Sequence, residues 1–242
     1  MKFFRSRLKL IGKVVYDVFL VALIPLISIM YNEISKDRKL LSDINNILVG
    51  ESAVYCDSCF GVPIFQKQNE EYGIDERVYD NKYVIVRAFF KDNSLIGYFV
   101  TAKSDDGKIK LLEQFNYLID KKPLGKFTFK NISDAPYFVG SYHSNGVGHY
   151  LYNESYYFAS RGNYYHFYFM YIEYGFNDLV FDNEAFESDV ELKNVNLVYD
   201  KGAPQIDRSR SFPNTYGVVS ADIEEIYELI SDYSNFNFQG LY

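Results

Sequence analysis

The longest apolar run of the chain lies close to its N-terminus. Residues 14–31 contain a single acidic residue, Asp17, and a single proline, Pro25. A helix rises about 1.5 Å per residue, so the run and its flanking residues approach the roughly 30 Å of a bilayer core. The pattern predicts a single-pass transmembrane helix over residues 14–31. A cleaved signal peptide and a buried or interfacial helix are the alternatives.

The charges on the two sides of this run predict its orientation. Residues 1–13 carry five basic residues and no acidic one, whereas residues 32–39 carry three basic residues diluted by two acidic ones. Basic flanks stay on the cytoplasmic side of a membrane. We therefore expect a cytoplasmic tail over residues 1–13, a helix in the inner (plasma) membrane, and a C-terminal domain in the periplasm.

An amphipathic pattern follows the apolar run. In residues 32–49, leucines and isoleucines recur every seven positions at Ile34, Leu41 and Leu48. This spacing predicts a helical stalk. The stalk either packs on its own domain or pairs with a second copy of the chain, which would make a homodimer through residues 34–48.

Beyond Gly50 the pattern changes from helical to strand-like. Residues 83–101 read as two apolar strands around a polar turn, and residues 149–174 read as two aromatic strands around another turn. Ser220 precedes a helical pattern and is predicted to cap a C-terminal helix. The fold class expected for the chain is α+β: a transmembrane helix, a stalk, and an antiparallel β-rich domain over residues 50–242.

The aromatic strands are rich in tyrosine at alternate positions. Alternation predicts that one face packs in the core while the other stays wet. Exposed tyrosines suit binding surfaces because they offer large contact area and a hydroxyl group. A binding surface for a protein or a small ligand is therefore predicted at Tyr152, Tyr156, Tyr164 and Tyr168. The alternative is a sheet face covered by the C-terminal helix.

The charge of the chain is uneven. Residues 1–39 carry eight basic and three acidic residues, a net charge of +5, and the whole chain carries −7, which leaves about −12 for residues 40–242. An acidic domain repels phosphate backbones, so nucleic acid is not an expected partner.

Few residues carry recognisable chemistry. Cys56 and Cys59 form a C-x-x-C pair, for which a disulfide is predicted in an exported domain. Redox catalysis, zinc binding and reduced thiols are the alternatives. His143 and His149 flank a glycine-containing segment that reads as a ligand loop or a tight turn, and His166 lies within an aromatic strand. The sequence contains no nucleophile, metalloprotease or phosphate-loop motif, so no cofactor or metal and no enzymatic activity is predicted.

Three stretches together resemble the ETEC domain proteins of enterobacteria. They are residues 60–63 (FGVP), the hairpin over residues 83–101, and the tyrosine-rich pair over residues 152–175. The resemblance covers about residues 10–200. It implies one N-terminal membrane helix followed by a β-rich domain, and it implies no activity and no functional residue.

These observations favour a membrane-anchored, non-enzymatic protein whose β-rich domain binds a ligand or partner. A membrane-acting effector of a toxin or phage-defence system is the first alternative, because Asp17 and Pro25 are unusual in a simple tether. An exported enzyme with a site hidden from the sequence is the second.

Overall fold

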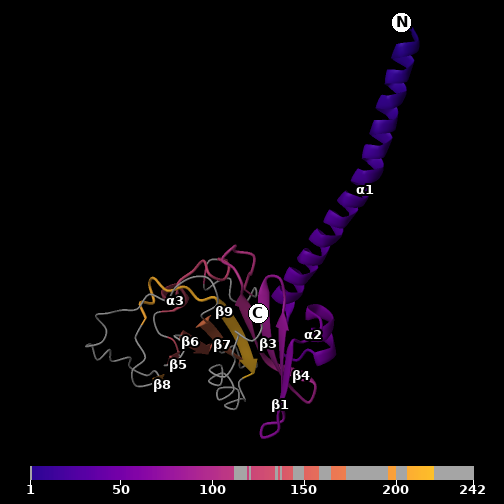
Figure 1. The fold of residues 1–242 in the computed structure, drawn as a ribbon. Coiled ribbons are helices and arrows are strands. Elements are labelled where there is room, and N and C mark those ends of the chain that lie inside the picture. Colours follow the sequence, from indigo (N-terminus) through magenta and orange to yellow (C-terminus); the bar gives the residue numbers. More distant parts are fainter. Residues whose placement is uncertain are drawn as a thin grey trace. The chain divides into compact units, whose positions relative to one another are not determined.

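The computed structural model describes residues 2–111, 119, 121–133, 136, 138–143, 150–157, 165–172, 196–199 and 206–220. Within these ranges only the backbone is described for residues 2–20, 22, 138–143, 150, 151, 157 and 196–199. The chain divides into two compact units, Met1–Ser42 and Asp43–Tyr242. Figure 1 labels the helices and all of the strands except β2.

A single helix, α1 (Lys2–Asn46), covers both the predicted membrane segment and most of the predicted stalk (Figure 1). No helix in the part of the chain that the structure describes is both long and apolar enough to cross a membrane. The side chain of Asp17 lies outside the described residues. Ile44 in the last turn of the helix and Ile47 just after it are almost fully buried within the second unit, whereas Ile34 and Leu48 of the predicted stripe are 48 and 55% exposed. The homodimer through residues 34–48 stays a prediction.

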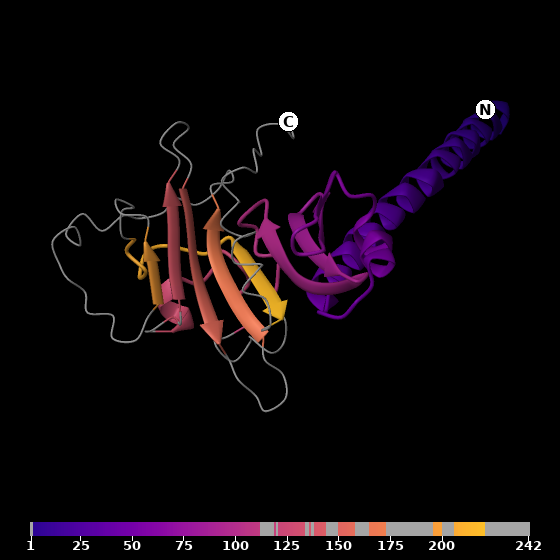
Figure 2. The same cartoon turned by 90° about the horizontal axis from the view of Figure 1, so that it is seen from below.

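Nine described strands form one sheet, in the order β1-β2-β3-β4-β9-β7-β6-β5-β8 (Figure 2). Their bounds are β1 (Phe65–Asn69), β2 (Ile74–Asp80), β3 (Val84–Lys91), β4 (Ser94–Ala102), β5 (Phe138–His143), β6 (Tyr150–Tyr157), β7 (Tyr165–Ile172), β8 (Asn196–Tyr199) and β9 (Thr215–Ser220). Only the β5–β8 pair is parallel. Together with α2 (Ala53–Phe60) and α3 (Phe129–Ile132), this sheet confirms the predicted α+β class.

The predicted hairpin over residues 83–101 is confirmed as β3 and β4. Lys91 pairs with Ser94, and the two residues between them, Asp92 and Asn93, have φ angles of 51° and 64°. Two left-handed residues make the turn whose twist matches that of the flanking strands, and Asp and Asn tolerate this conformation best after glycine. The aromatic strands β6 and β7 likewise pair with each other.

Strand β9 is an element that the sequence pattern does not predict. Ser220 is its last residue, and the predicted C-terminal helix that Ser220 would cap falls outside the described residues. The strand lies between β4 and β7 and pairs with both. Asn214, the residue before β9, holds the start of this strand beside the end of β7. Its side chain accepts a hydrogen bond from the Ile172 backbone N–H at 2.9 Å and donates one to the Ile172 carbonyl at 2.5 Å. β9 thus joins the two hairpins into one sheet.

The sheet is buried on both faces where its middle strands are described. One face holds a core cluster of Ile74, Phe89, Phe99, Tyr168, Met170, Ile172 and Val219. The other carries the edge-on ring pairs Tyr98–Tyr216 and Tyr156–Phe169. In β7 every residue from Phe167 to Ile172 is buried. The expectation that one face of the sheet is exposed to solvent is therefore wrong for this part of the sheet.

Candidate functional site

The C-x-x-C pair lies on the short helix α2, which is docked on the sheet. Ser52 caps the helix by accepting a hydrogen bond from the Tyr55 N–H at 3.1 Å. Ala53, Cys56 and Phe60 are its buried residues, a spacing of three and four that forms one helix face. The Phe60 ring packs on Tyr79 of β2, with ring centroids 5.5 Å apart.

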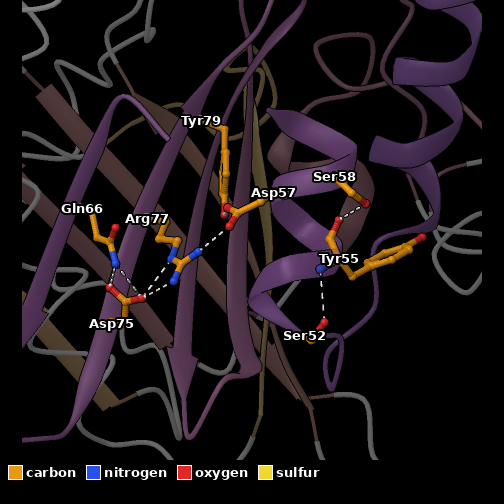
Figure 3. A network of polar contacts seen from close by, with 8 residues as sticks. All are labelled: Ser52, Tyr55, Asp57, Ser58, Gln66, Asp75, Arg77 and Tyr79. Carbon is orange, nitrogen blue, oxygen red and sulfur yellow. Dashed lines mark hydrogen bonds and ion pairs between the residues drawn. The ribbon is translucent and has the colours of Figure 1, made fainter. Parts of the chain in front are cut away.

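A polar network attaches the middle of this helix to β2 (Figure 3). The carboxylate of Asp57 accepts from Arg77 Nη1 at 2.7 Å and from the Tyr79 hydroxyl at 2.7 Å. Arg77 Nε also donates to Asp75 at 2.9 Å, and the Gln66 amide donates to both Asp75 oxygens at 3.0 and 3.1 Å. Burial, and then the contact with Asp57, raises the pKa of Tyr79, so its hydroxyl stays a donor. The network fixes α2 in place and leaves Asp57 with both oxygens occupied.

The two cysteines are free thiols in the structure. Cys56 is fully buried, and this burial raises the pKa of its thiol to about 12. A nucleophilic or redox-active cysteine needs the opposite shift, because the thiolate is the reactive form. The described residues contain no group of three or more metal-ligating side chains, although His149 and the side chain of His143 lie outside them. The predicted disulfide stays a prediction.

Thiol labelling is expected to distinguish the two cysteines. At pH 8 a pKa of about 12 leaves about one Cys56 thiol in ten thousand ionised, and burial shields it further. Native protein should therefore take up iodoacetamide at Cys59 alone, and at both cysteines in urea, as read by peptide mass spectrometry. A Cys59→Ser variant should stay unlabelled until it unfolds. Equal native rates at Cys56 and Cys59 would contradict this burial, and uptake only after reduction would reveal the predicted disulfide.

A second constellation surrounds Glu154 of β6. Tyr152, Glu154 and Tyr156 alternate along the strand and therefore share one face of the sheet. Glu154 is fully buried, and its carboxylate accepts from the Tyr152 hydroxyl at 2.6 Å and from the Tyr156 hydroxyl. Arg208 completes the site, donating from Nε to Oε1 at 2.5 Å and from Nη2 to Oε2 at 3.0 Å.

Arg208 also connects this carboxylate to α3. Its Nη2 donates to the carbonyls of Ser133 at 2.8 Å and Phe129 at 3.3 Å. Burial and the neighbouring Glu154 raise the pKa of Tyr152 and of Tyr156, so both hydroxyls stay protonated donors. Every oxygen of Glu154 thus has internal donors, and the constellation stabilises the fold instead of offering a free acid or base.

The predicted tyrosine surface is not a surface at the described positions. Tyr152, Tyr156 and Tyr168 are only 5, 3 and 7% exposed, and Tyr164 lies outside the described residues. The correction follows from the double burial of the sheet, in which Tyr168 belongs to the core cluster and the other two bind Glu154. His166 is half-buried, which lowers its pKa.

Sequence reasoning missed Glu154 and Arg208. Glu154 did carry a signal, because a carboxylate two positions from a tyrosine on each side shares their face of the strand. Arg208 carried none, because it lies in a polar segment that precedes β9 by several residues. Its role depends on a contact with a residue 54 positions away.

Comparison with known proteins yields only distant similarities. Neither a family model nor a curated protein matches the chain. An extracellular protein containing an SCP domain from Bacillus anthracis aligns with a TM-score of 0.32 at 11% identity, covering 72% of this chain and 44% of that one. A cysteine-rich secretory protein from Staphylococcus aureus gives 0.30 at 9% identity, covering 72% and 45%.

A third similarity is to a putative beta-lactamase inhibitor protein from Streptococcus mutans. Its TM-score is 0.24 at 14% identity, covering 60% of this chain and 91% of that one. This chain spans less than half the length of the first two proteins. TM-scores this low do not assign a shared fold, and the resemblance to the ETEC domain proteins stays a prediction.

Proposed function

We propose that this protein is a membrane-anchored binding protein, with α1 as the anchor and the β-sheet unit as a non-enzymatic partner-binding domain. The N-terminal tail would lie in the cytoplasm and the β-sheet unit in the periplasm. Its partners would be the lipid bilayer, through α1, and a protein or small ligand, through the sheet unit.

The observation that carries the proposal is the uncovered apolar surface of α1. Its exposed large apolar side chains are Val21, Ile24, Leu26, Ile27, Ile29, Met30, Tyr31 and Ile34, each between 48 and 72% exposed. Successive residues of a helix are about 100° apart, so these positions lie on every side of it. A helical segment with exposed apolar side chains on every side needs apolar surroundings on all sides. A bilayer supplies them, whereas a partner on one side does not.

The polar constellations support the non-enzymatic part of the proposal. Asp57 and Glu154 are each held by donors from neighbouring elements, and Cys56 is buried with a raised pKa. A catalytic acid, base or nucleophile needs access to a substrate and a free proton or lone pair. Glu154 and Cys56 are buried and lack this access, and both carboxylate oxygens of Asp57 already accept hydrogen bonds from Arg77 and Tyr79.

Alkaline carbonate extraction of bacterial membranes that contain the full chain tests the anchor. The wild-type protein should stay in the pellet and leave it only with detergent. An Ile24→Arg/Leu26→Arg variant should appear mostly in the supernatant, because each arginine near the centre of a membrane helix costs roughly 2.5–3.5 kcal/mol.

The matched control places the same charges on apolar residues outside the helix. Val62 and Ile64 are 88 and 45% exposed in the β-sheet unit, so Val62→Arg/Ile64→Arg should stay in the pellet. Release of the wild-type chain by carbonate would overturn the anchor. Equal release of both arginine variants would mean that charge, and not position in α1, decides the partition.

A further inference from the structure

The exposed apolar side chains of the β-sheet unit are concentrated in one short stretch. Among its described residues, the exposed large apolar side chains are Leu48, Val54, Tyr55, Val62 and Ile64. All of them flank or belong to α2, and the last two directly precede β1. Figure 3 shows the Tyr55 ring on the side of α2 that is turned away from Arg77 and Tyr79. Single exposed apolar residues need no explanation, but Val62 and Ile64 lie beside the open strand edge described next.

The strand that follows this stretch is an edge of the sheet. Among the described strands, β1 is hydrogen-bonded to β2 alone. The carbonyl of Val78 in β2 accepts from the Ile64 N–H at 2.8 Å, so the backbone of Val78 faces β1. Backbone direction alternates along a strand. The pairs Phe65–Val78, Lys67–Glu76 and Asn69–Ile74 therefore bond to each other, and the N–H and C=O groups of Gln66 and Gln68 point to the open edge.

The chemistry of this edge favours a strand from another protein over a second copy of this chain. Two copies of β1 could pair antiparallel about a two-fold axis and use the outward-pointing backbone groups of both glutamines. In that pairing Gln66 of one copy bonds to Gln68 of the other. Lys67 then lies directly opposite its own counterpart, and like charges directly opposite each other are destabilising. A foreign strand with a carboxylate at that position converts the repulsion into an attraction.

We propose that β1 binds an extended segment of another protein as a further strand of the sheet. The segment would bond to the backbone of Gln66 and Gln68, place a carboxylate opposite Lys67, and cover Val62 and Ile64 with β-branched apolar side chains. This mode uses main-chain hydrogen bonds for affinity and alternate side chains for specificity. The inference rests on the proposed function, since it locates the surface of the partner-binding domain.

A synthetic peptide that meets these requirements tests the proposal. The probe is a fluorescent seven-residue peptide, TVEVTVT with blocked ends, titrated with the full chain in detergent micelles and followed by anisotropy. We expect saturable binding. A Gln68→Pro variant, which removes an outward-pointing N–H, should bind about tenfold more weakly. Gln68→Thr, which removes the same side chain but keeps the N–H, should bind like the wild type.

Two controls separate strand addition from other effects. The same peptide with N-methyl groups on the amides that would face β1 should bind neither the wild-type protein nor the Gln68 variants. The melting temperature of Gln68→Pro should match the wild type, because proline is tolerated at an edge position whose N–H faces solvent. Absence of peptide binding, equal binding of the methylated peptide, or full affinity of Gln68→Pro would each overturn the inference. None of these outcomes alters the carbonate extraction, which tests the anchor separately.

Discussion

Arg208→Met is expected to lower the free energy of unfolding by about 3–5 kcal/mol, the cost of leaving a buried charge without its partner. Glu154 is fully buried, and Arg208 is the cation that contacts both of its oxygens. Methionine preserves much of the side-chain volume but donates no hydrogen bond. The carbonyl of Ser133 at the end of α3 loses its donor as well. Urea denaturation of the full chain in detergent, followed by tyrosine fluorescence, measures the loss.

Arg210→Met is the matched control for this prediction. Arg210 lies two residues further along the same segment, but its side chain is 64% exposed and pairs with Asp207 at the surface. An exposed pair of this kind contributes little to stability, so Arg210→Met should unfold close to the wild type. A Glu154→Leu/Arg208→Met double variant should recover part of the stability, because it removes both charges together. If Arg208→Met costs no more than Arg210→Met, the Glu154 constellation does not stabilise the fold.

The parts of the fold that local chemistry determines could be predicted from the sequence. The β3–β4 hairpin follows from two apolar runs and from Asp92 and Asn93, which accept the left-handed backbone of a two-residue turn. The helix over residues 32–46 follows from apolar residues at helical spacing, although Ile34 and Leu48 of the seven-residue pattern are 48 and 55% exposed. In both cases the determining residues are neighbours in the chain, so a short window contains the whole signal.

The parts that depend on distant contacts could not be predicted. Strand β9 is short, and Thr215 at its start bonds to Thr101, 114 positions away, through their hydroxyls at 2.9 Å. Alternation in the aromatic strands shows which residues share a face, but it does not show whether that face is covered. The sequence therefore does not distinguish a tyrosine surface from a covered face. Once the face is covered, the buried carboxylate of Glu154 needs hydrogen-bond donors, and Tyr152 and Tyr156 supply them.

Gly217→Ala is expected to destabilise the protein by about 1–3 kcal/mol, because the added methyl group has no space. A Cβ atom at Gly217 would lie 2.3 and 2.4 Å from two ring atoms of Phe99 and 3.0 Å from the Tyr98 carbonyl oxygen. The Phe99 ring cannot turn away, since it is fully buried and packs edge-on against Phe89 and Tyr168. Thermal unfolding measured by circular dichroism should show a lower melting temperature.

The sign of this effect identifies its cause. A glycine in an extended strand that has room for a methyl group gains about 0.4–1 kcal/mol on conversion to alanine, because the unfolded chain loses conformational freedom. The Phe99 ring makes the two closest contacts that oppose this gain, and the Tyr98 carbonyl oxygen makes the third. Gly217→Ala should therefore cost less when Phe99 is replaced by leucine, and a double-mutant cycle should return a coupling of about 1 kcal/mol or more. A more stable Gly217→Ala protein would mean that Phe99 does not cover β9, and the junction between the two hairpins would then need a different packing.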